Sequence, residues 1–456
     1  MRFGPGLFRQ AAVGLALASS PFFCSRTASA DVWSTGYYPG YRQSAMPASV
    51  VDFTALTHVI HFSVAPNSDG TLNTTVNSIT ASRSNDLVSR AHTAGKKVLI
   101  CVGGAGATGF LGATTNAHRA TFIANLVSFM TTYAYDGIDI DWEPLNSSDV
   151  TQYTNFVNDL RAALNGFTPH KLLTVATAQQ PAWFASLQGQ FDQINLMTYD
   201  LAGTWPGGVT WFNSPIYDGG YRFPSTGGLV PSTDGMVTSF INAGVAPGKL
   251  GIGIAFYGQL WAGGTGMSTG GATLPRQSWT IAPTNSSLSY STIMSTYYQS
   301  NLYHWDTAAQ AAYLSLDNTG SANDKFISYD DEHTCQAKVS YARNRALGGV
   351  MIWELGEGYR SSQPAGQRDP LLQAVKQSRL ATPNLTGIQR SNLDIRISFT
   401  TMPLALYRVQ WTTNLASGAW NTLTNNVSGT GGIMQITDAG ALGSRAQRFY
   451  RVRTPP

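Results

Sequence analysis

The run Asp136-Gly-Ile-Asp139-Ile-Asp141-Trp-Glu143 places acidic side chains at alternating positions. Successive side chains of a β-strand point to opposite faces, so Asp139, Asp141 and Glu143 share one face and the intervening Ile residues share the other. Like charges packed together in a low dielectric repel, so at least one of these carboxyls must have a raised pKa. A carboxyl that stays protonated near neutral pH can act as a general acid.

The apolar alternation indicates that this strand is buried, which disfavours the alternative of a solvated acidic strand. The run ends where a strand meets its following loop, and barrel enzymes carry their chemistry at that end. Glu143 is therefore the candidate acid. Asp141 and Glu143 would approach a glycosidic bond from the same side, whereas most glycosidases flank the bond with two carboxylates. Another nucleophile would then be needed, and the 2-acetamido group of a substrate that carries one can serve.

The elements that must position these acids follow a repeating pattern. Short apolar, β-branched runs are each followed by a polar or Gly-rich loop and a helix-like segment, which predicts parallel strands with crossover helices. Eight such strands predict a closed (β/α)8 TIM barrel of the α/β class. The predicted strands are Val32–Tyr38, Thr57–Ser63, Lys97–Gly103, Gly137–Glu143, Leu172–Ala178, Gln193–Asp200, Leu250–Tyr257 and Gly348–Trp353. The predicted helices include Ser82–Ala94, Asn116–Tyr133, Val150–Asn165, Asp234–Ala243 and Asp331–Arg345.

The barrel is predicted over residues 31–378, with an insertion on its rim at about 262–325, where a Gly-, Ser- and Thr-rich stretch is too long for an ordinary connection. A linker over 379–390 is expected to lead to a β-sandwich-like accessory domain over 391–456, because apolar residues alternate from Leu393 onward. This small all-β domain could bind carbohydrate, act as a spacer or stabilise the chain. The alternation places Trp411 on the apolar face, which favours core packing for that residue.

The first thirty residues have the layout of a secretory signal peptide: basic Arg2 and Arg9, an apolar stretch, and the small-residue site Ala28-Ser29-Ala30. We therefore expect a leader over 1–30 and a secreted protein. Ser and Pro residues interrupt the apolar stretch, so a membrane span is not expected. Cleavage removes three Arg and no acids, which lowers the formal charge from +4 to +1 and argues against a nucleic-acid partner.

The mature chain would keep two cysteines, Cys101 and Cys335, which are too few for a disulfide framework. We expect two free buried thiols, although a single bridge is the alternative. The seven histidines show no paired metal-ligand spacing, so neither a metal nor another cofactor is expected. With 43% hydrophobic and 12% charged residues, the 456-residue chain can bury a large core. We expect a monomer.

The acidic run resembles the DxxDxDxE signature of glycoside hydrolase family 18, the chitinase family. The resemblance extends to Thr35-Gly-Tyr-Tyr38 in the first strand and to Met197-Thr-Tyr-Asp200 in the sixth. It also includes Lys97-Val-Leu-Ile-Cys-Val-Gly-Gly104 in the third strand, where Cys101 stands at a position that is usually Ser in the family. That change removes a strong hydroxyl donor near Asp136 or Asp139. The resemblance covers about residues 31–376 and omits the C-terminal region.

The resemblance implies a role for each matching residue. Glu143 would protonate the leaving oxygen and later activate water, and Asp141 would hold the acetamido N–H. Asp139 would share a proton with Asp141, and Tyr199 would donate to the acetamido oxygen. Asp200 would bind the sugar. The other implied substrate contacts are Trp353, Met197, Trp205 and Tyr37, and the supporting residues are Asp136, Gly103 and Gly104.

These roles imply a secreted chitinase that hydrolyses β-1,4-linked N-acetylglucosamine polymers with retention through an oxazolinium ion. Chitin and chitooligosaccharides are the expected partners. An endo-β-N-acetylglucosaminidase acting on glycoprotein glycans, or an inert chitin-binding lectin on the same barrel, are the alternatives. The presence of Glu143 favours an enzyme over a lectin. Trp142, Trp205 and Trp353 favour a linear chitin chain as the substrate.

Overall fold

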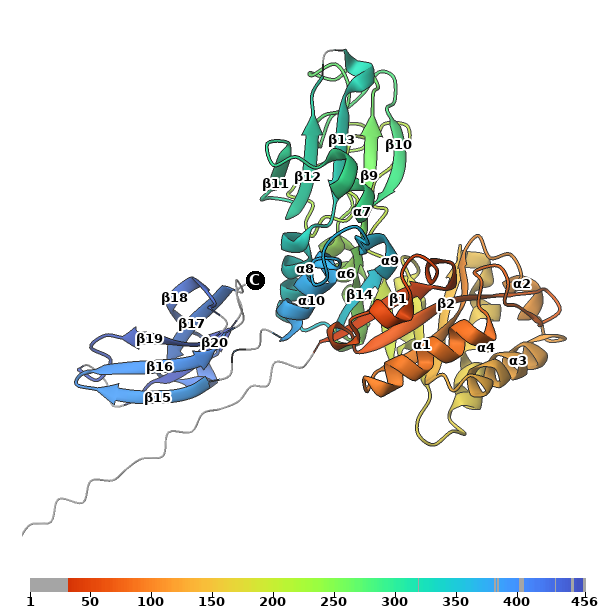
Figure 1. The fold of residues 1–456 in the computed structure, drawn as a ribbon, viewed down its shortest axis with the longest axis horizontal. Helices are drawn as coiled ribbons and strands as arrows, with labels where there is room; N and C mark the ends of the chain where they lie inside the picture. The colour runs from red at the N-terminus through yellow and green to blue at the C-terminus, as the bar shows by residue number, and fades with distance from the viewer. Residues whose placement is uncertain are drawn as a thin grey trace, which may run out of the picture.

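Parallel strands form a closed barrel, whose elements lie to the right in Figure 1. The computed structural model describes residues 32–318, 320–380, 383, 385–401, 406–430, 432–443 and 447–453, so the predicted leader over 1–30 lies outside the described residues. The sheet runs in the order β1-β14-β8-β7-β6-β5-β4-β2, and a β1–β2 pairing closes it. The barrel strands are β1 (Trp33–Pro39), β2 (His58–Pro66), β4 (Lys97–Ala105), β5 (Gly137–Glu143), β6 (Leu172–Thr177), β7 (Gln193–Leu196), β8 (Leu250–Ala255) and β14 (Gly349–Trp353). The predicted TIM barrel is confirmed.

Helices cover the outside of the barrel. The five predicted helices are present as α1 (Ala81–Thr93), α3 (Arg119–Thr132), α4 (Val150–Leu164), α6 (Thr233–Asn242) and α8 (Glu332–Asn344). The short helices α2 (Phe110–Ala113), α5 (Pro181–Leu187) and α9 (Leu355–Gly358) and the closing helix α10 (Pro370–Leu380) complete this layer. Polar side chains begin several helices; Asp331, for example, accepts from the backbone N–H of Thr334 at 2.7 Å. Such N-caps satisfy donors that the first turn leaves free.

The sixth predicted strand, Gln193–Asp200, is shorter than expected. β7 ends at Leu196, and its ladders to β6 and β8 end there too. Asp200 has φ +54°, a left-handed conformation that a strand cannot hold. Tyr199 and Asp200 therefore lie in the loop 197–232 that follows β7, and not on the strand itself.

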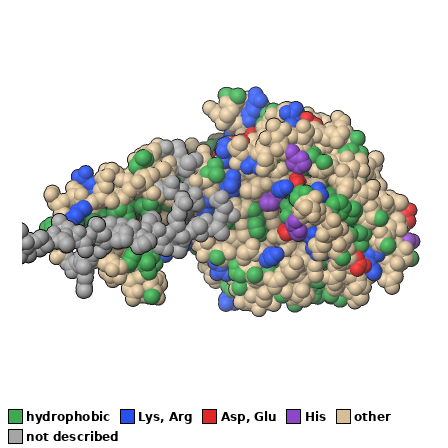
Figure 2. All heavy atoms as spheres, turned by 90° about the horizontal axis from the view of Figure 1, so that it is seen from below, with side chains coloured by type: hydrophobic (Ala, Val, Ile, Leu, Met, Phe, Trp, Pro, Cys, Tyr) green, Lys and Arg blue, Asp and Glu red, His purple; other side chains and the backbone are tan. Residues whose placement is uncertain are grey.

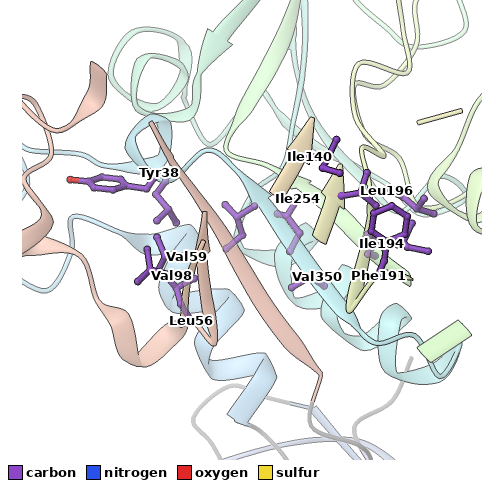
Figure 3. Close-up of a cluster of buried hydrophobic side chains, with 14 of the residues drawn as sticks. Tyr38, Leu56, Val59, Val98, Ile140, Phe191, Ile194, Leu196, Ile254 and Val350 are labelled. Carbon is purple, nitrogen blue, oxygen red and sulfur yellow. The ribbon is translucent and has the colours of Figure 1, made fainter. Parts of the chain in front are cut away.

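The outer faces of the strands form the main core together with the helices (Figure 3). Ile138 and Ile140 of β5 are fully buried there. Trp142 also faces outward: its ring stacks on Phe110 at a centroid distance of 4.5 Å and meets Tyr153 edge-on at 5.8 Å. The expectation that Trp142 helps to bind a sugar chain is therefore wrong, because strand alternation turns it away from the barrel interior.

The segment between β8 and α8 forms a five-stranded antiparallel sheet in the order β10-β9-β13-β12-β11. Its strands are β9 (Tyr257–Ala262), β10 (Thr284–Ser289), β11 (Tyr303–Asp306), β12 (Ala311–Leu316) and β13 (Lys325–Tyr329). This sheet extends beyond the predicted 262–325 at both ends. Trp261 and Phe326 from the sheet and Trp211 and Phe212 from loop 197–232 share one buried cluster, so the inserted sheet and the loop stabilise each other.

Residues 385–453 contain two three-stranded antiparallel sheets, β15-β16-β19 and β18-β17-β20. Their strands are β15 (Leu385–Ser391), β16 (Asp394–Thr400), β17 (Leu406–Thr412), β18 (Asn421–Ser428), β19 (Ile433–Asp438) and β20 (Phe449–Arg453). β15 begins inside the predicted linker 379–390. The sequence pattern did not reveal this start, because a register shift between Leu385 and Gly387 interrupts the alternation of the strand. Trp411 is half-buried, and the Arg448 guanidinium lies 4.1 Å from its ring centroid, which leaves that face unavailable for a sugar.

Both cysteines are free and buried, as predicted. Within the described ranges, no helix combines the length and the apolar character that crossing a membrane requires. On the face in Figure 2, Lys and Arg side chains lie among Asp, Glu and apolar side chains and do not gather into one continuous basic patch.

The two C-terminal sheets share a core built from their own residues, among them Ile397, Phe399 and Val409. Ending the chain after Leu380 should therefore leave the barrel folded, with a Tm within about 3 °C of the full-length value, equivalent to roughly 1 kcal/mol. Circular dichroism during heating would measure this. Ending the chain after Gln367 is the matched control: it removes α10, whose Leu371 and Leu372 are buried, and should lower the Tm strongly. A chain ending at Leu380 that does not fold would show that the barrel requires the C-terminal sheets.

Candidate active site

The acidic strand β5 lies between β4 and β6, with Asp139 opposite Cys101 and Thr174. Asp139 and Asp141 point into the barrel interior with 0% and 3% of their surfaces exposed, and Glu143 is half-buried at the C-terminal end of the strand. The three acids predicted to share one face are thus brought together. Among the described residues, none of the three forms an ion pair with a Lys, Arg or His.

Asp139 is surrounded by neutral donors. Tyr37 Oη donates to Oδ2 at 2.9 Å, Thr174 Oγ1 donates to Oδ1 at 2.5 Å, and the Cys101 thiol donates as well. Burial nevertheless raises the pKa of Asp139 to about 6, because these hydrogen bonds offset only part of the desolvation. Burial followed by the charge of Asp139 raises the pKa of Cys101, so the thiol keeps its proton and remains a donor.

Asp141 and Glu143 share a hydrogen bond. Burial raises the pKa of Asp141 most, and the charges of Glu143 and Asp139 raise it further. Burial also raises the pKa of Glu143, although the hydrogen bond from Asp141 opposes that rise. The two carboxyls therefore share one proton. The other carboxyl oxygen, Asp141 Oδ1, is buried and has no hydrogen-bond partner among the described residues. An unpaired buried acceptor is costly, so this atom favours a ligand that brings a donor.

Tyr199 and Asp200 reach the acids from the loop after β7. A Cβ on Gly253 would lie 2.7 Å from the Tyr199 ring, so only glycine at position 253 leaves room for this ring. Burial and then the charges of Asp141 and Glu143 raise the pKa of Tyr199, so its hydroxyl stays protonated and can donate. Asp200 is exposed, and its Oδ1 accepts from Gln259 Nε2 at 2.9 Å.

Aromatic rings line the barrel interior beside the acids. The ring of Trp353 lies 5.5 Å from that of Tyr37 and 4.7 Å from that of Phe62, centroid to centroid. Tyr37 is fully buried and its hydroxyl donates to Asp139; the expectation that Tyr37 contacts sugar is corrected, because its side chain has no exposed surface. Met197 is half-buried and packs against the same cluster.

Trp205 is 44% exposed in loop 197–232. A Cβ on Gly208 would lie 3.2 Å from the indole of Trp205 and 3.2 Å from that of Trp279, so the two rings flank one small residue. Sequence reasoning missed Trp279, Thr174 and Gln259. Thr174 could have been found as a polar residue of interior parity in an apolar strand, whereas no local signal marks the other two.

Asp136 lies at the other end of β5 from Glu143. Lys97 Nζ and the backbone N–H of Val98 each donate to its carboxylate at 2.9 Å, and His92 Nε2 lies 2.8 Å away. Burial raises the pKa of Asp136, but these hydrogen bonds outweigh burial and lower it overall. The structure therefore places Asp136 outside the site, where it joins β4 to β5, and Cys101 contacts Asp139 and not Asp136.

Gly103 and Gly104 allow β4 to pack closely on its neighbours. Their φ angles are +109° and +115°. A Cβ on Gly103 would lie 2.0 Å from the backbone oxygen of Asp141, and one on Gly104 would lie 2.5 Å from the Phe62 ring. These close approaches fix the strand that carries Asp141 and the ring beside Trp353. Over the described part of the chain, no group of three or more His, Cys, Asp or Glu residues is suited to hold a metal ion.

The raised pKa of Asp139 yields a stability prediction. Protonation of this residue favours the folded state fully below pH 3.8, and that contribution is lost as the pH rises to about 6. Asp139→Asn should remove this dependence, so its unfolding free energy relative to wild type should rise by about 1–3 kcal/mol from pH 4 to pH 7. Urea unfolding at both pH values measures it. Cation-paired Asp136 provides the control, because its pKa is lowered and its contribution to stability therefore changes mainly below pH 3.8; Asp136→Asn should differ from wild type by a nearly constant amount between pH 4 and pH 7. A constant difference for Asp139→Asn would contradict the raised pKa.

The model of one protein family, Glycosyl hydrolases family 18, matches residues 34–358. Chitinase A1 of Niallia circulans is 29% identical over 353 residues, which are 70% of this chain and 46% of that protein. This chain thus spans about half the length of that relative. A family 18 N-acetylglucosaminidase from Paenibacillus barengoltzii is 26% identical, with a TM-score of 0.62 over 76% of this chain and 99% of that one.

The fold is also that of the Ostrinia furnacalis Group IV chitinase, whose structure in complex with allosamidin gives a TM-score of 0.64 at 21% identity. That comparison covers 76% of this chain and 98% of the insect protein. The family match includes all eight barrel strands except the first residue of β1, together with the acidic strand. The protein therefore belongs to family 18 of the glycosyl hydrolases.

Proposed function

We propose that the protein is a chitinase, which hydrolyses β-1,4-linked N-acetylglucosamine polymers with retention of configuration. The observation that carries this proposal is the one-sided carboxylate strand. Asp139, Asp141 and Glu143 all project from β5, so no second carboxylate of the strand faces the opposite side of a bound sugar. An internal nucleophile supplied by the substrate resolves this, and the acetamido group is correctly placed in N-acetylglucosamine.

The hydrogen bonding of the acids suggests how the proton reaches the leaving group. Asp141 and Glu143 share a proton, and Asp141 Oδ1 has no partner among the described residues. A substrate acetamido N–H would supply the missing donor. That bond favours the ionised form of Asp141, so the proton would pass to Glu143, where it is needed to protonate the glycosidic oxygen. Ionised Asp141 would also stabilise the positive oxazolinium ion.

Tyr199 and Trp353 complete the proposed site. The protonated Tyr199 hydroxyl would donate to the acetamido oxygen and align it with the anomeric carbon, and Trp353 would stack on the apolar face of that sugar. Asp200 at the rim would bind the sugar through its exposed carboxylate. After the first step, ionised Glu143 would activate the water that opens the oxazolinium ion.

A polymeric substrate is favoured by the exposed Trp205 and by Trp279 beside it. The named relative is a chitinase, and the Ostrinia neighbour is a chitinase bound to allosamidin. We further propose that the protein is secreted, since residues 1–30 have the layout of a signal peptide, and that it acts as a monomer on chitin and chitooligosaccharides.

Glu143→Gln should lower kcat for chitin oligomers by at least about 100-fold, because the amide cannot protonate the leaving oxygen. Oligomer affinity, measured by calorimetry, should change less than about threefold, since the shape of the site is kept. Glu332→Gln, at the start of α8, is the matched control and should retain wild-type kcat. If Glu143→Gln kept more than a tenth of wild-type kcat, another residue would be the acid.

Product analysis tests the substrate and the mechanism together. Incubation with chitin hexamer should release shorter oligomers whose new reducing ends are first β-anomers, as nuclear magnetic resonance within the first minutes would show. Early α-anomers would contradict retention. A high-mannose glycopeptide should remain intact; its cleavage in place of the hexamer would indicate an endo-β-N-acetylglucosaminidase. Release of single sugars alone would indicate an N-acetylglucosaminidase, the activity named for the Paenibacillus neighbour.

A further inference from the structure

A buried ion pair outside the carboxylate site joins Asp330, just before α8, to Lys338 in the middle of that helix. Lys338 is 0% exposed and Asp330 is 3% exposed, and Lys338 Nζ lies 2.5 Å from Asp330 Oδ2. Asp330 Oδ2 also accepts from the backbone N–H of Ala255, the last residue of β8, at 2.9 Å. Burying two charges costs several kcal/mol, and a pair of apolar side chains often stabilises a core equally well. Stability alone therefore does not explain why an ion pair is buried at this position.

Lys338 Nζ has a second acceptor, the hydroxyl of Ser214 in loop 197–232. A serine hydroxyl has one proton and two lone pairs. Because the ammonium group occupies a lone pair, the serine proton must point elsewhere, and it points at the backbone oxygen of Thr198, 2.5 Å from Ser214 Oγ. The nearby positive charge also polarises the hydroxyl and strengthens that bond. The ion pair thus fixes the direction in which Ser214 donates.

The network ends on the backbone on both sides of Tyr199. Ser214 holds the carbonyl of Thr198, while the side chain of Asn213 accepts from the N–H of Asp200 at 3.0 Å. Thr198 Oγ1 accepts from the N–H of Gly253 at 2.9 Å. The β7 ladders have already ended at Leu196, so no strand pairing restrains these peptide groups. Side chains of the loop, together with the backbone of Gly253 in β8, supply the restraint that strand pairing does not.

The Tyr199 hydroxyl itself has only a weak contact in the described residues, with Met351 Sδ at 3.7 Å. Its direction is therefore set by its backbone and by packing against Gly253. An error of about 1 Å in a group that positions a substrate can cost ~100-fold in rate. The peptide groups beside Tyr199 must accordingly be held firmly.

We infer that Ser214, Lys338 and Asp330 are positioning residues that hold Tyr199 and Asp200 in register with the carboxylates of β5. This inference rests on the proposed function, in which Tyr199 aligns the acetamido group. None of the three residues is placed in contact with substrate. They act through the backbone of residues 198–200, so their removal should affect the catalytic step more than folding.

A double-mutant cycle tests this inference. Ser214→Ala should lower kcat on chitin oligomers about tenfold, which corresponds to the loss of one buried hydrogen bond, and should change KM less than about twofold. Tyr199→Phe removes the hydroxyl that is being positioned. In the Tyr199→Phe background, Ser214→Ala should lower kcat less than about twofold, because there is no hydroxyl left to misplace. Additive effects would overturn the inference.

Ser34→Ala is the matched control. Ser34 is also buried, and its hydroxyl donates to the backbone oxygen of Ala55 at 2.5 Å, away from loop 197–232. It should leave kcat within about twofold while lowering the Tm as much as Ser214→Ala does. An equal loss of kcat in both variants would mean that Ser214 has only a structural role. Ser214→Thr keeps the hydroxyl and should restore most of kcat; failure of this rescue would count against the hydrogen bond.

The ion pair is tested with a variant that leaves no unpaired charge. Lys338→Met alone would strand a buried Asp330 and could unfold the chain, so the double variant Lys338→Met with Asp330→Asn is used. It should fold, with a lowered kcat similar to that of Ser214→Ala; wild-type kcat would exclude the ion pair from the network. If Tyr199→Phe alone has wild-type kcat, the proposed role of Tyr199 fails. If Tyr199→Phe lowers kcat but Ser214→Ala leaves it unchanged, the inference about the positioning residues fails and the proposed function stands.

Discussion

Two carboxyl groups are buried in the barrel interior without a cation beside them, and the chemistry of the site depends on this. In the described structure, hydroxyl and thiol donors hold Asp139, Asp141 shares a proton with Glu143, and neither Asp contacts a Lys or Arg. A cation in contact with these carboxyls would stabilise their ionised forms and lower both pKa values. Asp136 shows this contrast at the opposite end of the strand, where hydrogen bonds from Lys97, Val98 and His92 lower its pKa. The absence of a cation beside Asp139 and Asp141 keeps a transferable proton next to Glu143.

The same constraint explains the residues that surround the acids. Tyr37 and Thr174 can each donate one hydrogen bond without bringing charge, and Cys101 adds a weak donor of similar size to Ser. A serine hydroxyl at position 101 would donate more strongly and stabilise ionised Asp139 further. The cysteine therefore fits a site in which the pKa of Asp139 remains raised, to about 6. Buried Lys338 does not disturb this balance, because Asp330 neutralises it within 2.5 Å.

The barrel and the acidic strand could be predicted because both depend on local alternation. Burial of one face of β5 requires Ile138 and Ile140 to face the helices, which fixes where Asp139 and Asp141 point. The same alternation, applied to Trp142, would have placed it on the outer face, but its aromatic character suggested a sugar contact instead. The inserted sheet could not be predicted, since its short strands lie in a long stretch rich in Gly, Ser and Thr, and its core is completed by Trp211 and Phe212 from a loop remote in sequence. Gln259 was missed for the same reason: its partner, Asp200, is 59 residues away.

These long-range contacts show that the rim of the barrel is one connected structure. Gln259 of β9 holds the Asp200 carboxylate at 2.9 Å, and Ser328 of β13 accepts from the backbone N–H of Asn213 at 2.9 Å. Asn213 in turn holds the backbone N–H of Asp200. The inserted sheet therefore does more than extend the surface, because the loop that carries Tyr199 and Asp200 takes its conformation from that sheet. In a barrel whose strand β7 ends at Leu196, the remaining distance to the carboxylates is spanned by a loop that only such tertiary contacts can hold in place.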